Sequence, residues 1–198
     1  SNRRAPIAKK IYEELGGSSP ILKLTEEQAE ALESKLNKEQ TVNEYKCFIV
    51  MRCWHPRATE VIKNVQNYKP EEIILMPLYP QYSAATSGSS IQEWKDVCKK
   101  NKYKIKTSTI CCYPTDKNFI NAHTKEIIKK TKDFKNYKLI FSAHGLPEKN
   151  IKKGDPYQWQ VEQSVKNIVK NLNDDNLDWV LSYQSRVGPL KWIGPPTD

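Results

Sequence analysis

Residues 138–182 read KLIFSAHGLPEKNIKKGDPYQWQVEQSVKNIVKNLNDDNLDWVLS. Two short apolar runs, residues 138–141 and 179–182, lie at the ends of this stretch. Between them, Asp155 and Pro156 form a helix start signal, because a capping residue followed by proline suits the first turn of a helix. The apolar positions that follow recur at helical spacing: Val161, Val165, Ile168 and Leu172. The order strand, helix, strand predicts a βαβ unit with parallel strands.

The same alternation extends over most of the chain. We expect further strands at residues 46–51, 72–76 and 104–110, which are short runs bounded by polar turns. Further helices are expected after a capping box at Thr25 and over these ranges: 5–15, 57–67, 89–101 and 116–132. Most of the strands are apolar on both faces, as strands buried in a parallel sheet are. The sequence therefore predicts a doubly wound α/β fold, whose functional groups lie in loops after the carboxyl ends of the strands.

The composition is that of a globular protein with excess positive charge. The 198 residues are 38% hydrophobic and 28% charged, which is enough apolar material for a packed core. No stretch approaches the roughly 20 apolar residues that span a bilayer, and the opening SNRRAPIAKK lacks the apolar core of a signal peptide. The net charge of +9 favours an anionic partner: a nucleic acid, an acidic membrane surface or a carboxylated small molecule.

The sequence features that mark several functional classes are absent from this sequence. The lysines are scattered over predicted helices and loop ends rather than gathered in a stripe with aromatic residues, which argues against a nucleic-acid partner. There is no GxGxxG, GxxxxGKS/T, HExxH or GxSxG, so we expect no nucleotide cofactor, no zincin site and no hydrolase elbow. The five cysteines include no CxxC, which disfavours a disulfide framework and a thiolate zinc site and indicates a reducing compartment.

Two predicted loops carry side chains suited to binding and proton transfer. Residues 77–90 hold two tyrosines, four serines and a threonine around Gly88, which suits either the cradling of a flat ligand with polar edges or the capping of the next helix. The strand at 138–141 leads directly to His144, whose imidazole can accept a proton or bind a divalent metal at a strand end. The alternative for His144 is a histidine held in a turn by hydrogen bonds. We expect His55, which precedes Pro56, to shape its turn, and His123, within a predicted helix, to be packed or solvated.

Eight motifs in chain order resemble those of the ferrochelatase family, whose members insert ferrous iron into a porphyrin in the last step of haem synthesis. Together they cover nearly the whole chain, so the resemblance is far more specific than any one motif. The motifs are RRAP (3–6), GGSSP (16–20), MRCWHP (51–56), PLYPQYS (77–83), TSGSS (86–90), SAHGLP (142–147), KGDPY (153–157) and QSRVGPLKWIGPPTD (184–198).

The resemblance implies two chelatase-type, Rossmann-like α/β domains with parallel sheets flanked by helices, over residues 1–112 and 113–198, and a porphyrin in the cleft between them. It implies that His144, the match to the family's active-site histidine, either binds iron or accepts pyrrole protons. Seven residues are the implied contacts to the porphyrin and its propionates: Arg4, Tyr12, Ser19, Arg52, Tyr82, Tyr157 and Trp192. A guanidinium and hydroxyls suit carboxylates, and aromatic side chains suit the walls of a flat macrocycle.

The same resemblance implies the partners. The porphyrin, protoporphyrin IX or coproporphyrin III, and ferrous iron are expected as substrates. The cysteines of this sequence do not support an iron–sulfur cluster. We expect a cytoplasmic protein, and its positive charge is compatible with peripheral contact to the acidic inner membrane.

Some features depart from the family pattern. Cys53 stands where many members carry tyrosine beside the arginine of the RCWHP motif. The family's opening strand with its Leu-Gly-Gly-Pro segment, and the glutamate that faces the active-site histidine, have no match here, so both domains are expected to be incomplete. We therefore expect the 198-residue chain on its own to have little or no chelatase activity. Two alternatives stay open: a cobalt or nickel tetrapyrrole chelatase, and a non-catalytic tetrapyrrole- or anion-binding module.

Overall fold

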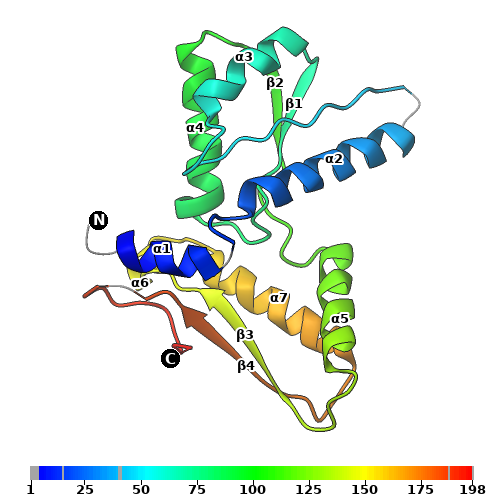
Figure 1. Cartoon of the computed structure of the whole chain (residues 1–198), viewed down its shortest axis with the longest axis vertical. Coiled ribbons are helices and arrows are strands. Elements are labelled where there is room, and N and C mark those ends of the chain that lie inside the picture. The colour runs from blue at the N-terminus through cyan, green and yellow to red at the C-terminus, as the bar shows by residue number, and fades with distance from the viewer. Residues whose placement is uncertain (1–4, 15, 40–41, 187, 198) are drawn as a thin grey trace. The chain divides into compact units, whose positions relative to one another are not determined.

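The computed structural model describes residues 5–14, 16–39, 42–186 and 188–197. The chain forms two compact units, Ser1–Pro70 and Glu71–Asp198. The first contains helices, whereas the second contains two parallel two-stranded sheets with helices beside them (Figure 1). The predicted α/β class with parallel strands flanked by helices is thus confirmed.

In the first unit, the described residues form α1 (Ala5–Glu14), α2 (Ile21–Glu39) and α3 (Ala58–Tyr68). Helix α1 ends before Gly17, which has a φ of 93° and donates its N–H to the carbonyl of Tyr12 at 2.6 Å. Helix α2 begins at Ile21, whose N–H donates to Ser19 Oγ at 3.3 Å. The predicted start at Thr25 is therefore wrong, because Thr25 lies within the helix and its hydroxyl donates to the carbonyl of Ile21 at 2.7 Å.

The strand predicted at residues 46–51 does not form. Among the described residues, the named strands pair as β1 with β2 and as β3 with β4. In the 46–51 segment, the N–H of Cys47 instead donates to Glu33 Oε2 at 2.7 Å, and the N–H of Met51 donates to the carbonyl of Pro56 at 2.7 Å. A strand requires hydrogen bonds from a neighbouring strand, and an apolar run does not supply that neighbour.

The second unit opens with a βαβ arrangement. Strand β1 (Glu72–Leu75) is followed by a π-helical turn, η1 (Ala84–Gly88), then by α4 (Ser89–Lys100) and by β2 (Lys106–Thr109). The two strands are parallel, with Glu72 opposite Lys106 and Leu75 opposite Thr109. Residues 77–90 thus follow a strand end and continue into a helix, as predicted.

The stretch at residues 138–182 forms the second βαβ arrangement. After α5 (Lys117–Thr131) come β3 (Lys138–His144), the short α6 (Glu148–Lys152), α7 (Tyr157–Leu172) and β4 (Asp178–Gln184). Strands β3 and β4 are parallel, with His144 opposite Gln184. Figure 1 shows α7 beside this sheet and α5 beside α7. The core of this sheet consists of Leu146, Val161, Val165, Tyr183 and Ile193.

The strands are not buried on both faces, contrary to expectation. Exposure alternates along β3, so that Leu139 and Phe141 are half-buried while Ile140 is 58% exposed. The reason is that each sheet has two strands, and the apolar stripe of α7 packs on one face. The predicted domain boundary at residue 112 falls between the two sheets, inside the second unit, and stays a prediction.

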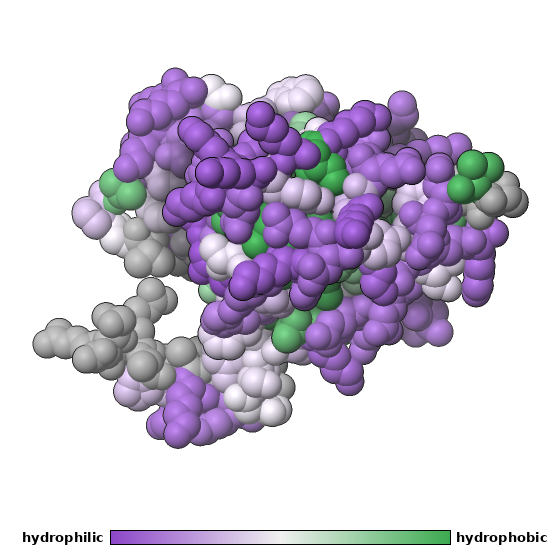
Figure 2. All heavy atoms as spheres, turned by 90° about the horizontal axis from the view of Figure 1, so that it is seen from above, coloured by the Kyte–Doolittle hydropathy of each residue, from purple (hydrophilic) through white to green (hydrophobic). Residues whose placement is uncertain are grey.

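Hydrophilic residues predominate on the face of the molecule that Figure 2 shows, with hydrophobic residues scattered singly among them. This distribution fits lysines that are mostly solvated. In the part of the chain that the structure describes, no helix combines the length and the apolar character needed to cross a membrane.

Candidate active site

His144 is the last residue of β3 and is exposed. Its backbone is held from two directions: the hydroxyl of Tyr157 donates to the His144 carbonyl at 3.0 Å, and the N–H of the next residue, Gly145, donates to the carbonyl of Gln184 at 2.7 Å. The strand end therefore holds the histidine in place while its side chain remains accessible.

The imidazole of His144 has a defined tautomer. Its Nδ1 lies 2.8 Å from the carbonyl oxygen of Gly145. A carbonyl oxygen only accepts hydrogen bonds, so Nδ1 carries the proton in this contact. In the neutral ring, the lone pair is then on Nε2, which is free to take a proton or to bind a divalent metal ion. The contact agrees with the interpretation of His144 as a histidine held in a turn by a hydrogen bond. Its role in proton transfer or metal binding stays a prediction.

Trp192 lies against the same turn. The segment around it runs antiparallel to residues 146–148: Glu148 N–H donates to the carbonyl of Lys191 at 2.9 Å, and Ile193 N–H donates to the carbonyl of Leu146 at 3.0 Å. A Cβ atom placed on Gly145 would lie 3.3 Å from Cε3 of Trp192. The glycine therefore lets the indole ring approach the backbone next to His144.

Tyr157, the first residue of α7, is half-buried. Burial raises the pKa of its phenol, and the nearby Asp155 carboxylate raises this pKa further, against the lowering effect of the hydrogen bond to the His144 backbone. The phenol therefore stays protonated at neutral pH and acts as a hydrogen-bond donor.

The loop that contains Tyr82 is fixed to the N-terminal part of α7. Gln160 Oε1 accepts the N–H of Tyr82 at 2.7 Å. Asp155 Oδ2 accepts both the hydroxyl of Ser83 at 2.8 Å and the N–H of Ala84 at 2.9 Å. Since the hydroxyl of Tyr157 also reaches His144, one helix start positions both predicted loops.

The sequence did not indicate the residues that make this attachment. Asp155 was interpreted only as a helix cap, which it also is, since its Oδ1 accepts the N–H of Tyr157 at 3.1 Å. Gln160 and Ser164 are buried polar residues within an otherwise apolar helix face, and Ser164 Oγ accepts Gln81 Nε2 at 2.8 Å. Polar residues on a buried helix face were the available signal, because buried polar groups need hydrogen-bond partners.

The predicted site residues thus fall into three groups. The second unit contains Tyr82, His144, Tyr157 and Trp192, all in loops or element ends around α7 and β3. The first unit contains Tyr12, which is 42% exposed on α1, Ser19 before α2, and the exposed Arg52. Arg4 lies outside the described residues.

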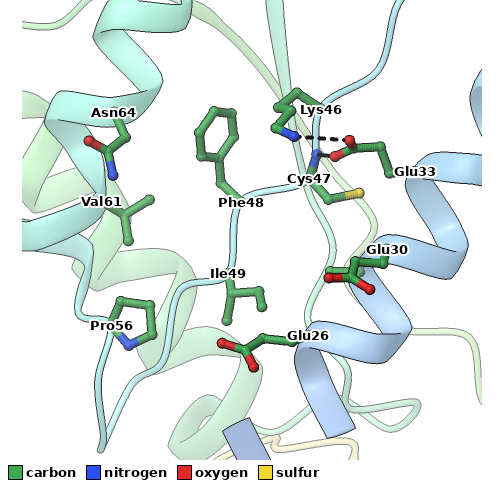
Figure 3. A pocket seen from close by; sticks show the side chains of 11 residues that line it. Glu26, Glu30, Glu33, Lys46, Cys47, Phe48, Ile49, Pro56, Val61 and Asn64 are labelled. Atoms are coloured by element: carbon green, nitrogen blue, oxygen red, sulfur yellow. Dashed lines mark hydrogen bonds and ion pairs between the residues drawn. The ribbon is translucent and has the colours of Figure 1, made fainter. Parts of the chain in front are cut away.

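A pocket of about 290 Å³ in the first unit contains none of the predicted site residues. Figure 3 shows that Phe48, Ile49 and Val61 lie on one side of it, with the glutamates of α2 on the other. The carboxylates of Glu26, Glu30 and Glu33 would repel an anionic ligand. We therefore do not place a carboxylated substrate in this pocket.

The charge beside α6, the short helix that follows the His144 turn, has the opposite sign. A hollow of about 170 Å³ there is lined by Lys149, Lys152 and Lys191, together with Glu148, and it too contains none of the predicted site residues. Glu148 pairs with Lys152 at 3.7 Å and with Lys191 at 3.3 Å. Three ammonium groups against one carboxylate leave a local excess of positive charge, which suits an anionic ligand.

The fold and this site define an α/β protein with an oriented histidine at the carboxyl end of a parallel strand. A family model described as Ferrochelatase matches residues 1–198, and the chain belongs to the ferrochelatase family. It is 81% identical over its whole length to a protein named Ferrochelatase from Pelagibacter ubique. It is likewise 49% identical to the Ferrochelatase of a Wolbachia of Drosophila simulans and 46% identical to that of Rickettsia bellii. The chain spans 58%, 64% and 54% of the lengths of these relatives, respectively.

Proposed function

We propose that the protein to which this chain belongs inserts ferrous iron into a porphyrin to form haem, with the release of two protons. Membership of the ferrochelatase family supports this reaction. The observation that carries the residue assignment is the orientation of His144, whose Nδ1 is bound to the carbonyl of Gly145 and whose Nε2 is available. The proposed substrates are those of the family, protoporphyrin IX or coproporphyrin III and Fe²⁺.

His144 is the catalytic residue of this proposal. Metalation removes two protons from pyrrole nitrogens and strips water from the iron, so a positioned base that accepts these protons lowers the barrier. Binding of Fe²⁺ and acceptance of a pyrrole proton both use the same Nε2 atom. The hydrogen bonds of Tyr157 and Gly145 to the backbone at this strand end hold that atom in one direction.

The residues that we assign to porphyrin binding are those that the family resemblance implies. Tyr82, Tyr157 and Trp192 supply aromatic surface around the His144 turn, and the lysines beside it supply positive charge for propionates. In the first unit we assign porphyrin and propionate contacts to Arg4, Tyr12, Ser19 and Arg52. We further propose a cytoplasmic protein, with the positive charge supporting peripheral contact with an acidic membrane.

The test is His144→Ala in the full-length protein that contains this sequence. We expect the rate of metalation to fall by about 100-fold or more, the usual contribution of a positioned acid–base group, while porphyrin binding persists. An anaerobic absorbance titration with porphyrin measures binding, and addition of Fe²⁺ measures turnover. His123→Ala is the matched control, because His123 is exposed on α5 and packs edge-on against Phe119 with ring centroids 4.6 Å apart.

Unchanged turnover in His144→Ala would remove His144 from catalysis. Porphyrin binding without turnover in the unmodified full-length protein would favour the non-catalytic binding module instead. Faster metalation with Co²⁺ or Ni²⁺ than with Fe²⁺ would favour the related chelatases of other metals.

A further inference from the structure

Cys111 and Cys112 form a close pair of thiols just beyond the end of β2. Their Sγ atoms lie 2.8 Å apart. Consecutive side chains of a strand point to opposite faces, so this approach requires the chain to have left the strand conformation, and β2 ends at Thr109. The pair is therefore a feature of the turn rather than of the sheet.

The backbone holds this turn on both sides of the pair. The N–H of Ile110 donates to the carbonyl of Leu75 at 2.9 Å, and the N–H of Tyr113 donates to the carbonyl of Pro80 at 2.8 Å. Both acceptors belong to β1 and the loop that follows it. The two sulfur atoms are thus preorganised on the same side of a fixed loop, which lowers the entropy cost of binding one ligand with both.

Access to the pair is asymmetric. Cys111 is exposed, whereas Cys112 is partly buried and accepts a hydrogen bond from Gln160 Nε2 at 3.5 Å. An incoming reagent therefore meets Cys111 first. The amide that contacts Cys112 is the one whose oxygen holds the N–H of Tyr82.

The number of donors selects the ligand. Among the described residues, no group of three or more histidine, cysteine, aspartate or glutamate side chains is placed to hold a metal ion. Zinc takes three or four protein ligands, so a two-sulfur site does not suit it. A soft trivalent element that forms two strong bonds to sulfur, and whose third bond is already taken by a substituent of its own, suits this pair of thiols.

We propose that Cys111 and Cys112 form a bidentate site for trivalent organoarsenic compounds. In the reaction, each thiol replaces one hydroxyl group of a dihydroxyarsine. Two S–H and two As–O bonds break, two As–S bonds form, and two water molecules leave. Arsenic stays trivalent and both sulfurs keep their oxidation state, so no oxidant or reductant is needed. The proposal does not depend on the porphyrin reaction.

The test uses phenylarsine oxide, which hydrates to the dihydroxyarsine, with the full 198-residue chain. Intact-mass spectrometry counts bound arsenicals in the presence of excess monothiol, and a dithiol such as 2,3-dimercaptopropanol is then added. We expect one arsenical per chain that resists the monothiol and is removed by the dithiol. Cys111→Ser and Cys112→Ser should each weaken retention by about 100-fold or more, because the second bond is intramolecular only when both thiols are present.

Cys53→Ser and Cys98→Ser are the matched controls and should retain the arsenical. Cys111 is exposed, so its substitution leaves the packed core unchanged. Cys111→Ser therefore tests the proposal even if Cys112→Ser does not fold. Retention by Cys111→Ser equal to that of the unmodified chain, or release of the arsenical from the unmodified chain by monothiol alone, would overturn the proposal.

Discussion

The hydroxyl of Tyr157 donates a hydrogen bond to the backbone carbonyl of His144 at 3.0 Å, which joins the first residue of α7 to the last residue of β3. The bond leaves the imidazole of His144 uninvolved. Tyr157 therefore acts on the candidate catalytic residue through its backbone position, in addition to any contact with a substrate.

Replacing Tyr157 with phenylalanine tests this bond. The change removes one hydrogen bond and leaves the His144 carbonyl without that donor, so we expect the free energy of unfolding to fall by about 0.5–1.5 kcal/mol. Urea unfolding measures the loss. Tyr79→Phe is the control, since Tyr79 is 48% exposed, and its stability should not change. Equal stability of Tyr157→Phe and the unmodified chain would contradict a stabilising role for the bond.

Asp155 should contribute more to the stability of the protein than a helix cap alone would. Asp155→Asn replaces a charged acceptor of hydrogen bonds from Ser83, Ala84 and Tyr157 with a neutral amide. Because bonds to a charged group contribute about 1.5–3 kcal/mol, we expect a loss of stability of that order and faster amide hydrogen exchange over residues 82–88. Asp175→Asn, at an exposed position, is the control. Unaltered exchange in 82–88 would show that the loop is held without this carboxylate.

Gly145 is predicted to tolerate no larger residue. A Cβ atom at this position would lie 2.9 Å from the carbonyl oxygen of Gln184, which is backbone and cannot move aside without disturbing β4. Gly145→Ala should therefore destabilise the protein by about 1–3 kcal/mol, the usual cost of overpacking, and shift the fluorescence of Trp192. Gly194→Ala provides the comparison, because its nearest atoms lie at 3.8 Å, an ordinary contact. A normal denaturation midpoint for Gly145→Ala would refute the steric argument.

The stability of the first unit should depend on acidic pH through Glu33. The N–H of Cys47, and after it the ammonium of Lys46, lower the pKa of Glu33 from its ordinary value of 4.5. A lowered folded-state pKa means that the stabilisation is fully present above about pH 4.5 and is lost as the pH falls through the lower, folded value. Glu33→Gln should reduce stability at pH 7 and flatten this acid dependence, as urea unfolding at several pH values would measure. Glu30→Gln is the control, and a pH dependence in Glu33→Gln as steep as in the unmodified chain would count against the linkage.

The secondary structure was largely predictable, because it depends on local patterns. Helical spacing and the start signal at Asp155 correctly indicated α7, and the apolar runs indicated β3 and β4. The strand predicted at 46–51 was wrong because strand formation depends on a neighbour that no local pattern specifies. The same limit explains why burial on both faces of the strands was overestimated.

The candidate site was likewise predictable from the sequence only in part. The placement of His144 at a strand end followed from the order of residues, since an apolar run leads directly into it. Its Nδ1 contact with Gly145 and the link to Tyr157 required coordinates. The attachment of the Tyr82 loop joins residues 72 to 83 positions apart in the chain, and no periodicity extends over such separations.

Residue order alone thus indicated the α/β class, the family resemblance and the position of His144 at a strand end, because apolar periodicity and short motifs are local properties of the chain. Which nitrogen of that histidine is available, which helix residues hold the neighbouring loop and how closely two adjacent thiols approach were settled by folding. These features depend on distances and directions between atoms, which are set only when hydrogen bonds between segments remote in the chain have formed.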